Sequence, residues 1–157
     1  MKRLVMAAAA LAAVCLAAGG VQAKPIPDAG LTIEEVKAWM EAEGYKVSIE
    51  TYESGTRYLR TETDGVKFDV DVYDCDKDRC RALQFNAGFN MEDGLPLAKV
   101  NQWNLEKRYL RCYDDDENDP HFAYDANLAP GGSYEALKDD LDVFTGFMPD
   151  VLKFIGW

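Results

Sequence analysis

Three turn signals between residues 47 and 89 constrain the fold more than any other feature, because each independently sets a strand register. Asp64-Gly65 is the dipeptide of a two-residue hairpin loop. Glu53-Ser54-Gly55 suits a three-residue loop with glycine at the left-handed position. The third turn, from Asp76 to Arg79, is flanked by Cys75 and Cys80. These signals predict four consecutive antiparallel strands.

All three turns agree on a single buried face. They place Leu59 opposite Val70 and Val70 opposite Phe85, and a slip of one residue in any strand would move apolar side chains to solvent. The expected buried face consists of Val47, Ile49, Leu59, Phe68, Val70, Val72, Leu83 and Phe85. The expected polar face consists of Tyr58, Arg60, Glu62, Lys67, Asp69, Asp71, Tyr73, Gln84 and Asn86. An antiparallel sheet with one solvated face is the natural reading.

Helix signals flank these strands. Thr32 and Glu35 form a capping box, and Gly44 is placed just beyond the end of that first helix. A second helix is expected from Pro96 to about Lys107. Ser133 caps a third helix, which Pro149 ends or kinks.

A second hairpin is expected from residues 109–113 and 121–128 around an acidic turn. The predicted order is α-β-β-β-β-α-β-β-α, an α+β domain with helices packed on one face of an antiparallel sheet.

The first 23 residues have the pattern of a secretory signal peptide. Lys2 and Arg3 form a basic start, an alanine-rich apolar run follows, and Val21-Gln22-Ala23 is a cleavage signal of small residues. A lipoprotein acylated at Cys15 is the alternative. We expect one domain over residues 24–157 of a periplasmic or secreted protein, starting with a short flexible lead at residues 24–30.

The charge balance excludes several kinds of partner. Residues 24–157 carry a formal net charge of −13, because two of the 17 Lys and Arg residues lie in the leader and all 28 acidic residues lie beyond it. A protein that binds nucleic acid or anionic lipid generally needs an excess of cationic side chains. We therefore expect no nucleic-acid partner, and no membrane insertion after signal cleavage.

Three cysteines remain after cleavage. Cys75 and Cys80 face each other in the predicted register, at a separation that a disulfide can bridge. Both are expected to point to the polar face, away from the core. Cys112 is expected to stay free.

Two chemical alternatives depend on the second hairpin. If its turn is centred on Asp116-Glu117, Cys112 faces His121 across the strands, as in a small thiol enzyme or hydrolase. Asp114, Asp116 and Asn118 begin like a calcium loop, as do Asp74, Asp76 and Asp78, which suggests an acidic cation-binding protein. Neither run has the glycine that such a loop needs at its sixth place. Solvated hairpin turns are the favoured interpretation of both runs, because turns favour Asp and Asn.

The chain resembles the YbjN family of bacterial sensory transduction regulators over nearly all of residues 24–157. The resemblance is carried by Leu31–Val36, Cys75–Cys80, Leu83-Gln84-Phe85, Ala87-Gly88-Phe89, Asn101–Asn104 and Asp125–Leu128. It implies a fold similar to the type III secretion chaperones, small α+β proteins that often dimerise and bind other proteins. The family has no defined catalytic residues, so no enzymatic activity, metal or cofactor is implied.

We therefore expect an exported, non-catalytic protein-interaction or regulatory module. Its partner is expected to be a protein or peptide, with a homodimer as a further possibility. The candidate partner-binding residues are Tyr58, Arg60, Asp69, Asp71, Tyr73, Gln84 and Asn86.

Overall fold

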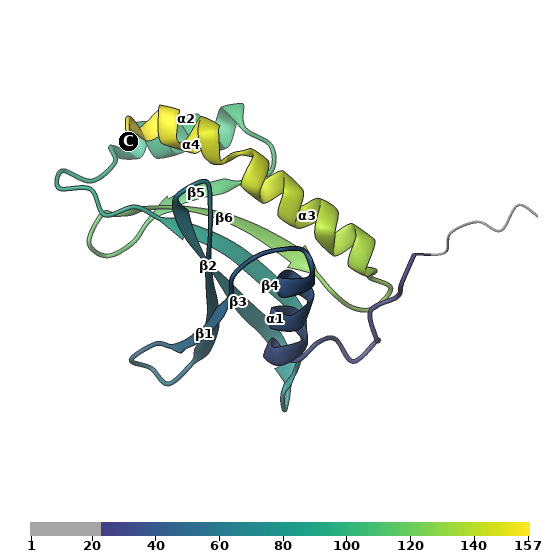
Figure 1. The fold of residues 1–157 in the computed structure, drawn as a ribbon. Helices are drawn as coiled ribbons and strands as arrows, with labels where there is room; N and C mark the ends of the chain where they lie inside the picture. Colours follow the sequence, from purple (N-terminus) through teal and green to yellow (C-terminus); the bar gives the residue numbers. More distant parts are fainter. Residues whose placement is uncertain (1–22) are drawn as a thin grey trace, which may run out of the picture.

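The computed structural model describes residues 23–157. The expected signal peptide, residues 1–23, thus lies outside the described residues except for Ala23, and so does Cys15. The described chain forms an α+β domain with a six-stranded antiparallel sheet (Figure 1). Its elements are α1 (Ile33–Ala42), β1 (Ser48–Thr51), β2 (Arg57–Thr63), β3 (Val66–Asp76), β4 (Arg79–Gly88), α2 (Leu97–Glu106), β5 (Arg111–Asp114), β6 (Pro120–Asn127), α3 (Tyr134–Gly146) and α4 (Met148–Ile155).

The sheet confirms the register predicted from the three turns. Its strand order is β1-β2-β3-β4-β6-β5. Ile49 pairs with Leu59, Leu59 with Val70, and Val70 with Phe85. Cys75 pairs with Cys80, as the third turn requires. Three local turn geometries therefore fix the long-range pairing of β1 to β4.

The helix ends follow the sequence signals. Thr32 Oγ1 accepts a hydrogen bond from the Glu35 backbone N–H, and the Glu35 carboxylate accepts one from the Thr32 N–H, so the predicted capping box is formed. Gly44 follows the last turn of α1 with a φ of 100°, a conformation that favours glycine. Ser133 caps α3 by accepting from the Ala136 N–H.

The predicted third helix is two helices in the structure. α3 ends at Gly146, and α4 begins at Met148 with Pro149 in its first turn. Proline is tolerated there because the first backbone N–H groups of a helix have no partner within it. The change of direction lets Met148 and Val151 of α4 reach the core.

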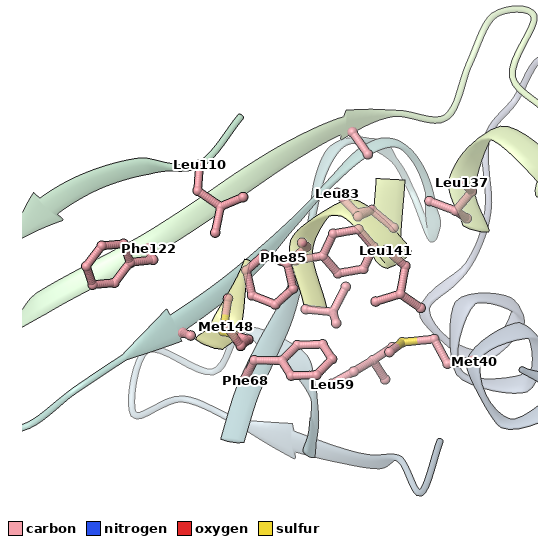
Figure 2. Packing of buried hydrophobic residues seen from close by; sticks show 14 of the residues in the cluster. Met40, Leu59, Phe68, Leu83, Phe85, Leu110, Phe122, Leu137, Leu141 and Met148 are labelled. Atoms are coloured by element: carbon pink, nitrogen blue, oxygen red, sulfur yellow. The ribbon is translucent and has the colours of Figure 1, made fainter. Parts of the chain in front are cut away.

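The core lies between the sheet and the helices. Phe144 of α3 contacts Phe68 and Phe85, at ring-centroid distances of 5.1 and 5.6 Å. Figure 2 shows Phe68, Phe85 and Leu141 converging between sheet and helix. All eight residues of the predicted buried face belong to this core or pack against it. The opposite face of the sheet carries none of the four described helices, so the predicted α+β layering is confirmed (Figure 1).

The segment from Lys24 to Gly30 is docked, which corrects the expectation of a flexible lead. The Ile26 N–H donates to the Gly132 carbonyl at 2.9 Å, and the Ile26 side chain is buried. Gly30 approaches β4 so closely that a Cβ would meet the Cys80 carbonyl oxygen at 2.0 Å. Among the helices of residues 23–157, none combines the length and apolar character that a membrane crossing requires.

Candidate functional site

The seven predicted partner-binding residues lie on one surface, the face of the sheet without helices. We call this surface the open face. Alternation along each strand places on it Tyr58, Arg60, Asp69, Asp71, Tyr73, Gln84 and Asn86, together with Arg111, Tyr113, His121, Ala123 and Asp125. The cross-strand rows run Arg60–Asp69–Asn86–Ala123–Arg111 and Asp71–Gln84–Asp125. The face therefore unites side chains from five strands.

Arg60 is held by two carboxylates. Its Nε and Nη2 donate to Asp69 Oδ1 and Oδ2 at 2.8 and 2.9 Å, and its Nη1 donates to Glu50 Oε2 at 3.2 Å. The bond to Asp69, reinforced by its charge, raises the pKa of Arg60, so the guanidinium stays charged. This cross-strand pair follows from the predicted register, whereas the contact with Glu50 was not predicted.

Tyr52 covers the adjoining part of the open face. Its ring stacks on Tyr58 at a centroid distance of 3.9 Å, and its hydroxyl donates to Asp71 Oδ1 at 3.1 Å. Tyr58 Oη in turn donates to Glu50 at 2.9 Å. Tyr52 was not among the predicted residues, because it lies beyond the end of β1 and therefore outside the strand alternation that defines the face.

Asp71 is the most deeply placed carboxylate of the open face, at 9% exposure. Burial raises its pKa, the bond from Tyr52 opposes that effect, and the charge of Asp69 adds to it. Opposite Asp71, Gln84 is 5% exposed and donates from Nε2 to Asp125 Oδ1 at 2.6 Å. Arg111 approaches Asp125 at 3.6 Å.

His121, Tyr113 and Asn86 form the other end of the open face. The His121 ring stacks on Tyr113 at 5.1 Å, and its Nδ1 lies 3.2 Å from Asn86 Oδ1. The ring presses against Gly88, where a Cβ would lie 2.6 Å from the imidazole. Beside it, a pocket of about 370 Å³ opens between Arg60, Lys67 and His121.

Cys112 and His121 do not face each other, which corrects the thiol-enzyme alternative. Tyr113 pairs with His121, and Cys112 pairs with Phe122. The register differs by one residue from the one expected, because the turn is centred on Glu117 and Asn118 takes up a left-handed φ of 64°. A one-residue shift moves a side chain to the other face. The Cys112 thiol is therefore buried on the core side, where burial raises its pKa to about 12.

The side chains of the acidic turns are not arranged as a metal-binding cluster. Among residues 23–157, no three His, Cys, Asp or Glu side chains are grouped so that they could hold a metal ion. In the β5–β6 turn, Asp115 Oδ1 instead accepts from the backbone N–H groups of Glu117 and Asp119, both at 2.9 Å. This arrangement is that of a turn stabilised by its own aspartate.

Cys75 and Cys80 are joined by a disulfide, and Cys112 is free. The bridge is not on the open face, where it was expected. It lines a surface depression with Ile33 and Val72, beside the first turn of α1, and Cys80 is 3% exposed. Asp74, at a left-handed φ of 53°, interrupts the alternation of β3 just before Cys75.

Comparison with known proteins supports one family. Residues 32–147 match the model of the YbjN family, described as "Putative bacterial sensory transduction regulator". A search of the curated proteins found no match. Among solved structures, the chain is similar to the Yersinia pestis type III secretion chaperone SycH, solved in complex with a stable fragment of YscM2. That chain is 16% identical, with a TM-score of 0.45 over 70% of this chain and 90% of SycH.

Proposed function

Because the chain belongs to the YbjN family, we propose that it is an exported, non-catalytic protein-interaction module that binds a protein or peptide partner on the open face. The observation that carries this proposal is the open face itself. Polar and aromatic side chains from five strands lie there without a covering helix from the described residues.

The side chains of the open face are ordered by their neighbours before any partner binds. Arg60 is fixed by two carboxylates, and Tyr52 by a stacked ring and a hydrogen bond. Fixing such groups in advance lowers the entropy cost of binding. Tyr73, two residues after Asp71 on β3, remains 47% exposed beside these ordered groups. Exposed tyrosine between ordered polar groups is typical of a protein-binding surface.

The separation of Cys112 from His121 favours a binding role over the thiol-enzyme alternative. The thiol lies against the core, and the imidazole lies on the open face. A nucleophile and its base need to be within hydrogen-bond reach of each other. The alternative thus loses the one pair of residues on which it rested.

The proposal includes export of the protein, and the sequence of residues 1–23 is the main support for it. Residues 1–23 have the basic start, apolar run and small-residue cleavage signal of a signal peptide. A disulfide between Cys75 and Cys80 fits an oxidising compartment. The intact mass of the exported product tests this, because cleavage should leave Lys24 as the first residue. A product that retains an acylated Cys15 would instead be a lipoprotein.

A matched pair of tyrosines tests the binding face. Tyr73 lies on the open face and is 47% exposed, whereas Tyr109 contacts Phe147 on the helix side and is 49% exposed. Residues 24–157 and the variants Tyr73→Ser and Tyr109→Ser serve as baits for a periplasmic extract. We expect proteins that the wild type and Tyr109→Ser retain and Tyr73→Ser loses. Equal capture by all three baits would contradict the proposed face.

A homodimer remains a separate prediction. The outer edge of β1 has no neighbouring strand within residues 23–157, so a second copy would extend the sheet there. Sedimentation velocity of residues 24–157 over a range of concentrations tests it, and a single monomer species throughout would argue against it.

A further inference from the structure

Asp71 is a nearly buried carboxylate without a cation. Among the described residues its only hydrogen bond comes from the Tyr52 hydroxyl, on Oδ1. The two arginines of the open face are already engaged, Arg60 with Asp69 and Glu50, and Arg111 with Asp125. A carboxylate at 9% exposure is normally paired with a positive charge. Asp71 therefore has a charge that nothing else in residues 23–157 neutralises.

Gln84 presents a second free acceptor directly across from Asp71. Its Nε2 donates to Asp125, which leaves Oε1 as the acceptor that no donor in the described chain engages. The Asp71 and Gln84 backbones are paired in the β3–β4 register, so their side chains emerge side by side on the open face. Asp71 Oδ2 and Gln84 Oε1 thus form a pair of acceptors for one donor group.

Tyr73 supplies an aromatic wall beside these acceptors. It lies two residues beyond Asp71 on β3, on the same face. Burial and the negative charges of Asp71 and Asp125 raise the pKa of its hydroxyl, and the positive charge of Arg111 opposes them in part. At 47% exposure, its ring is accessible to a ligand. A cation over a tyrosine ring is attracted by the electrons of the ring face.

We propose that Asp71, Gln84 and Tyr73 form a subsite that receives a lysine or arginine side chain of the protein partner. The ammonium or guanidinium group donates to Asp71 and Gln84 and lies against the Tyr73 ring. This inference rests on the proposed function and adds the chemistry of the partner, a basic and extended segment.

Charge complementarity supports this occupant over others. The four carboxylates of Glu50, Asp69, Asp71 and Asp125 outnumber the three cations of Arg60, Lys67 and Arg111 on this part of the face, and residues 24–157 carry a net charge of −13. A basic segment is therefore drawn to the protein and its face. A second copy bound face to face about a two-fold axis would instead oppose like charges.

Titration with defined peptides tests the subsite. The probe is an acetylated, amidated peptide of alternating arginine and threonine, and the matched probe replaces each arginine by glutamate. Both are titrated into ¹⁵N-labelled residues 24–157 at low salt. We expect the arginine peptide alone to bind, with the largest amide shifts at Asp71, Tyr73 and Gln84. Binding should weaken as salt is added.

Variants separate the subsite from general charge attraction. Asp71→Asn should weaken binding of the arginine peptide at least tenfold, and Tyr73→Ala about threefold or more. Asp139→Asn removes the same charge from the exposed surface of α3 and should change the affinity less than twofold. Amide spectra establish that each variant is folded.

Two results would overturn the inference. One is equal binding by the wild type and Asp71→Asn, and the other is no binding of the arginine peptide at millimolar concentration. If capture from extract still depends on Tyr73 in either case, the proposed function stands and only the basic partner is wrong. If capture is independent of Tyr73 as well, both fail.

Discussion

The side-chain amide of Asn104 makes both backbone hydrogen bonds of Cys112. Its Oδ1 accepts from the Cys112 N–H at 2.8 Å, and its Nδ2 donates to the Cys112 carbonyl at 2.9 Å. β5 is an edge strand, so these groups would otherwise be open to another chain. One side chain of α2 therefore occupies the position of a neighbouring strand, while Trp103 Nε1 donates to Leu110 at 2.8 Å.

Replacing Asn104 tests this closure of the edge. Asn104→Ala leaves a partly buried N–H and C=O without partners, and we expect a loss of about 1–3 kcal/mol in the free energy of unfolding. Asn101→Ala, on an exposed position of the same helix, should stay within about 0.5 kcal/mol of the wild type. Urea unfolding of both variants measures the difference. Equal stability of the two variants would show that the amide contributes nothing.

The disulfide is expected to pin the end of the β3–β4 hairpin. Cys75 and Cys80 are five residues apart, and such a short loop removes little entropy from the unfolded chain. The double variant Cys75→Ser/Cys80→Ser should therefore lose about 2 kcal/mol or less. Mass mapping of the exported, non-reduced protein should recover the Cys75–Cys80 link. A link from either residue to Cys112 is incompatible with the sheet described above.

Cys112 should be unreactive in the folded protein. Burial raises the pKa of its thiol to about 12, so very little thiolate exists at neutral pH. With the disulfide intact, we expect iodoacetamide to label Cys112 in urea and to leave it unlabelled in buffer over the same time. A matched reaction with free cysteine controls for reagent quality. Rapid labelling in buffer would place the thiol at the surface.

Asp71 should oppose folding at neutral pH. Its pKa is raised above the ordinary 3.8, chiefly by burial, so its charged form is less stable in the folded chain than in the unfolded one. Asp71→Asn keeps an acceptor for Tyr52 and should raise the thermal midpoint at pH 7. This advantage should shrink as the pH falls through the raised pKa toward 3.8. A pH-independent difference would mean that the charge is not its cause.

Asp69 provides the contrast for that experiment. It lies two residues before Asp71 on the same face, but both of its carboxylate oxygens accept from Arg60. Asp69→Asn removes this ion pair and should lower the thermal midpoint at pH 7. The corresponding loss in the free energy of unfolding should be about 1 kcal/mol or less, because the pair is partly exposed. Opposite signs for the two substitutions would separate a paired carboxylate from an unpaired one.

The strands from β1 to β4 were predictable because their turns are short and carry specific residues. A two-residue turn at Asp64-Gly65 allows only one pairing register between β2 and β3. With the β3–β4 pairing, that register places Leu59, Val70 and Phe85 on one face. The seven proposed binding residues followed from the same alternation. Tyr52 did not, because it follows the last residue of β1 and reaches Asp71 only through its own conformation.

The second hairpin was misjudged by one residue. An acidic turn from Asp114 to Asp119 offers several centres, and the left-handed Asn118 decides between them. The position of the disulfide was wrong for a similar reason, since the left-handed Asp74 cannot be recognised among its acidic neighbours. Both errors therefore have the same cause. In each hairpin, a single residue with positive φ changes the side of the sheet that a cysteine faces.

Site-specific photocrosslinking in the exported protein tests the central claim most directly. p-Benzoylphenylalanine is placed at position 73, on the open face, and separately at position 105, where Leu105 is 83% exposed on α2. We predict a crosslinked partner protein from position 73 and none from position 105. Crosslinks that arise only at position 105 would contradict binding at the open face.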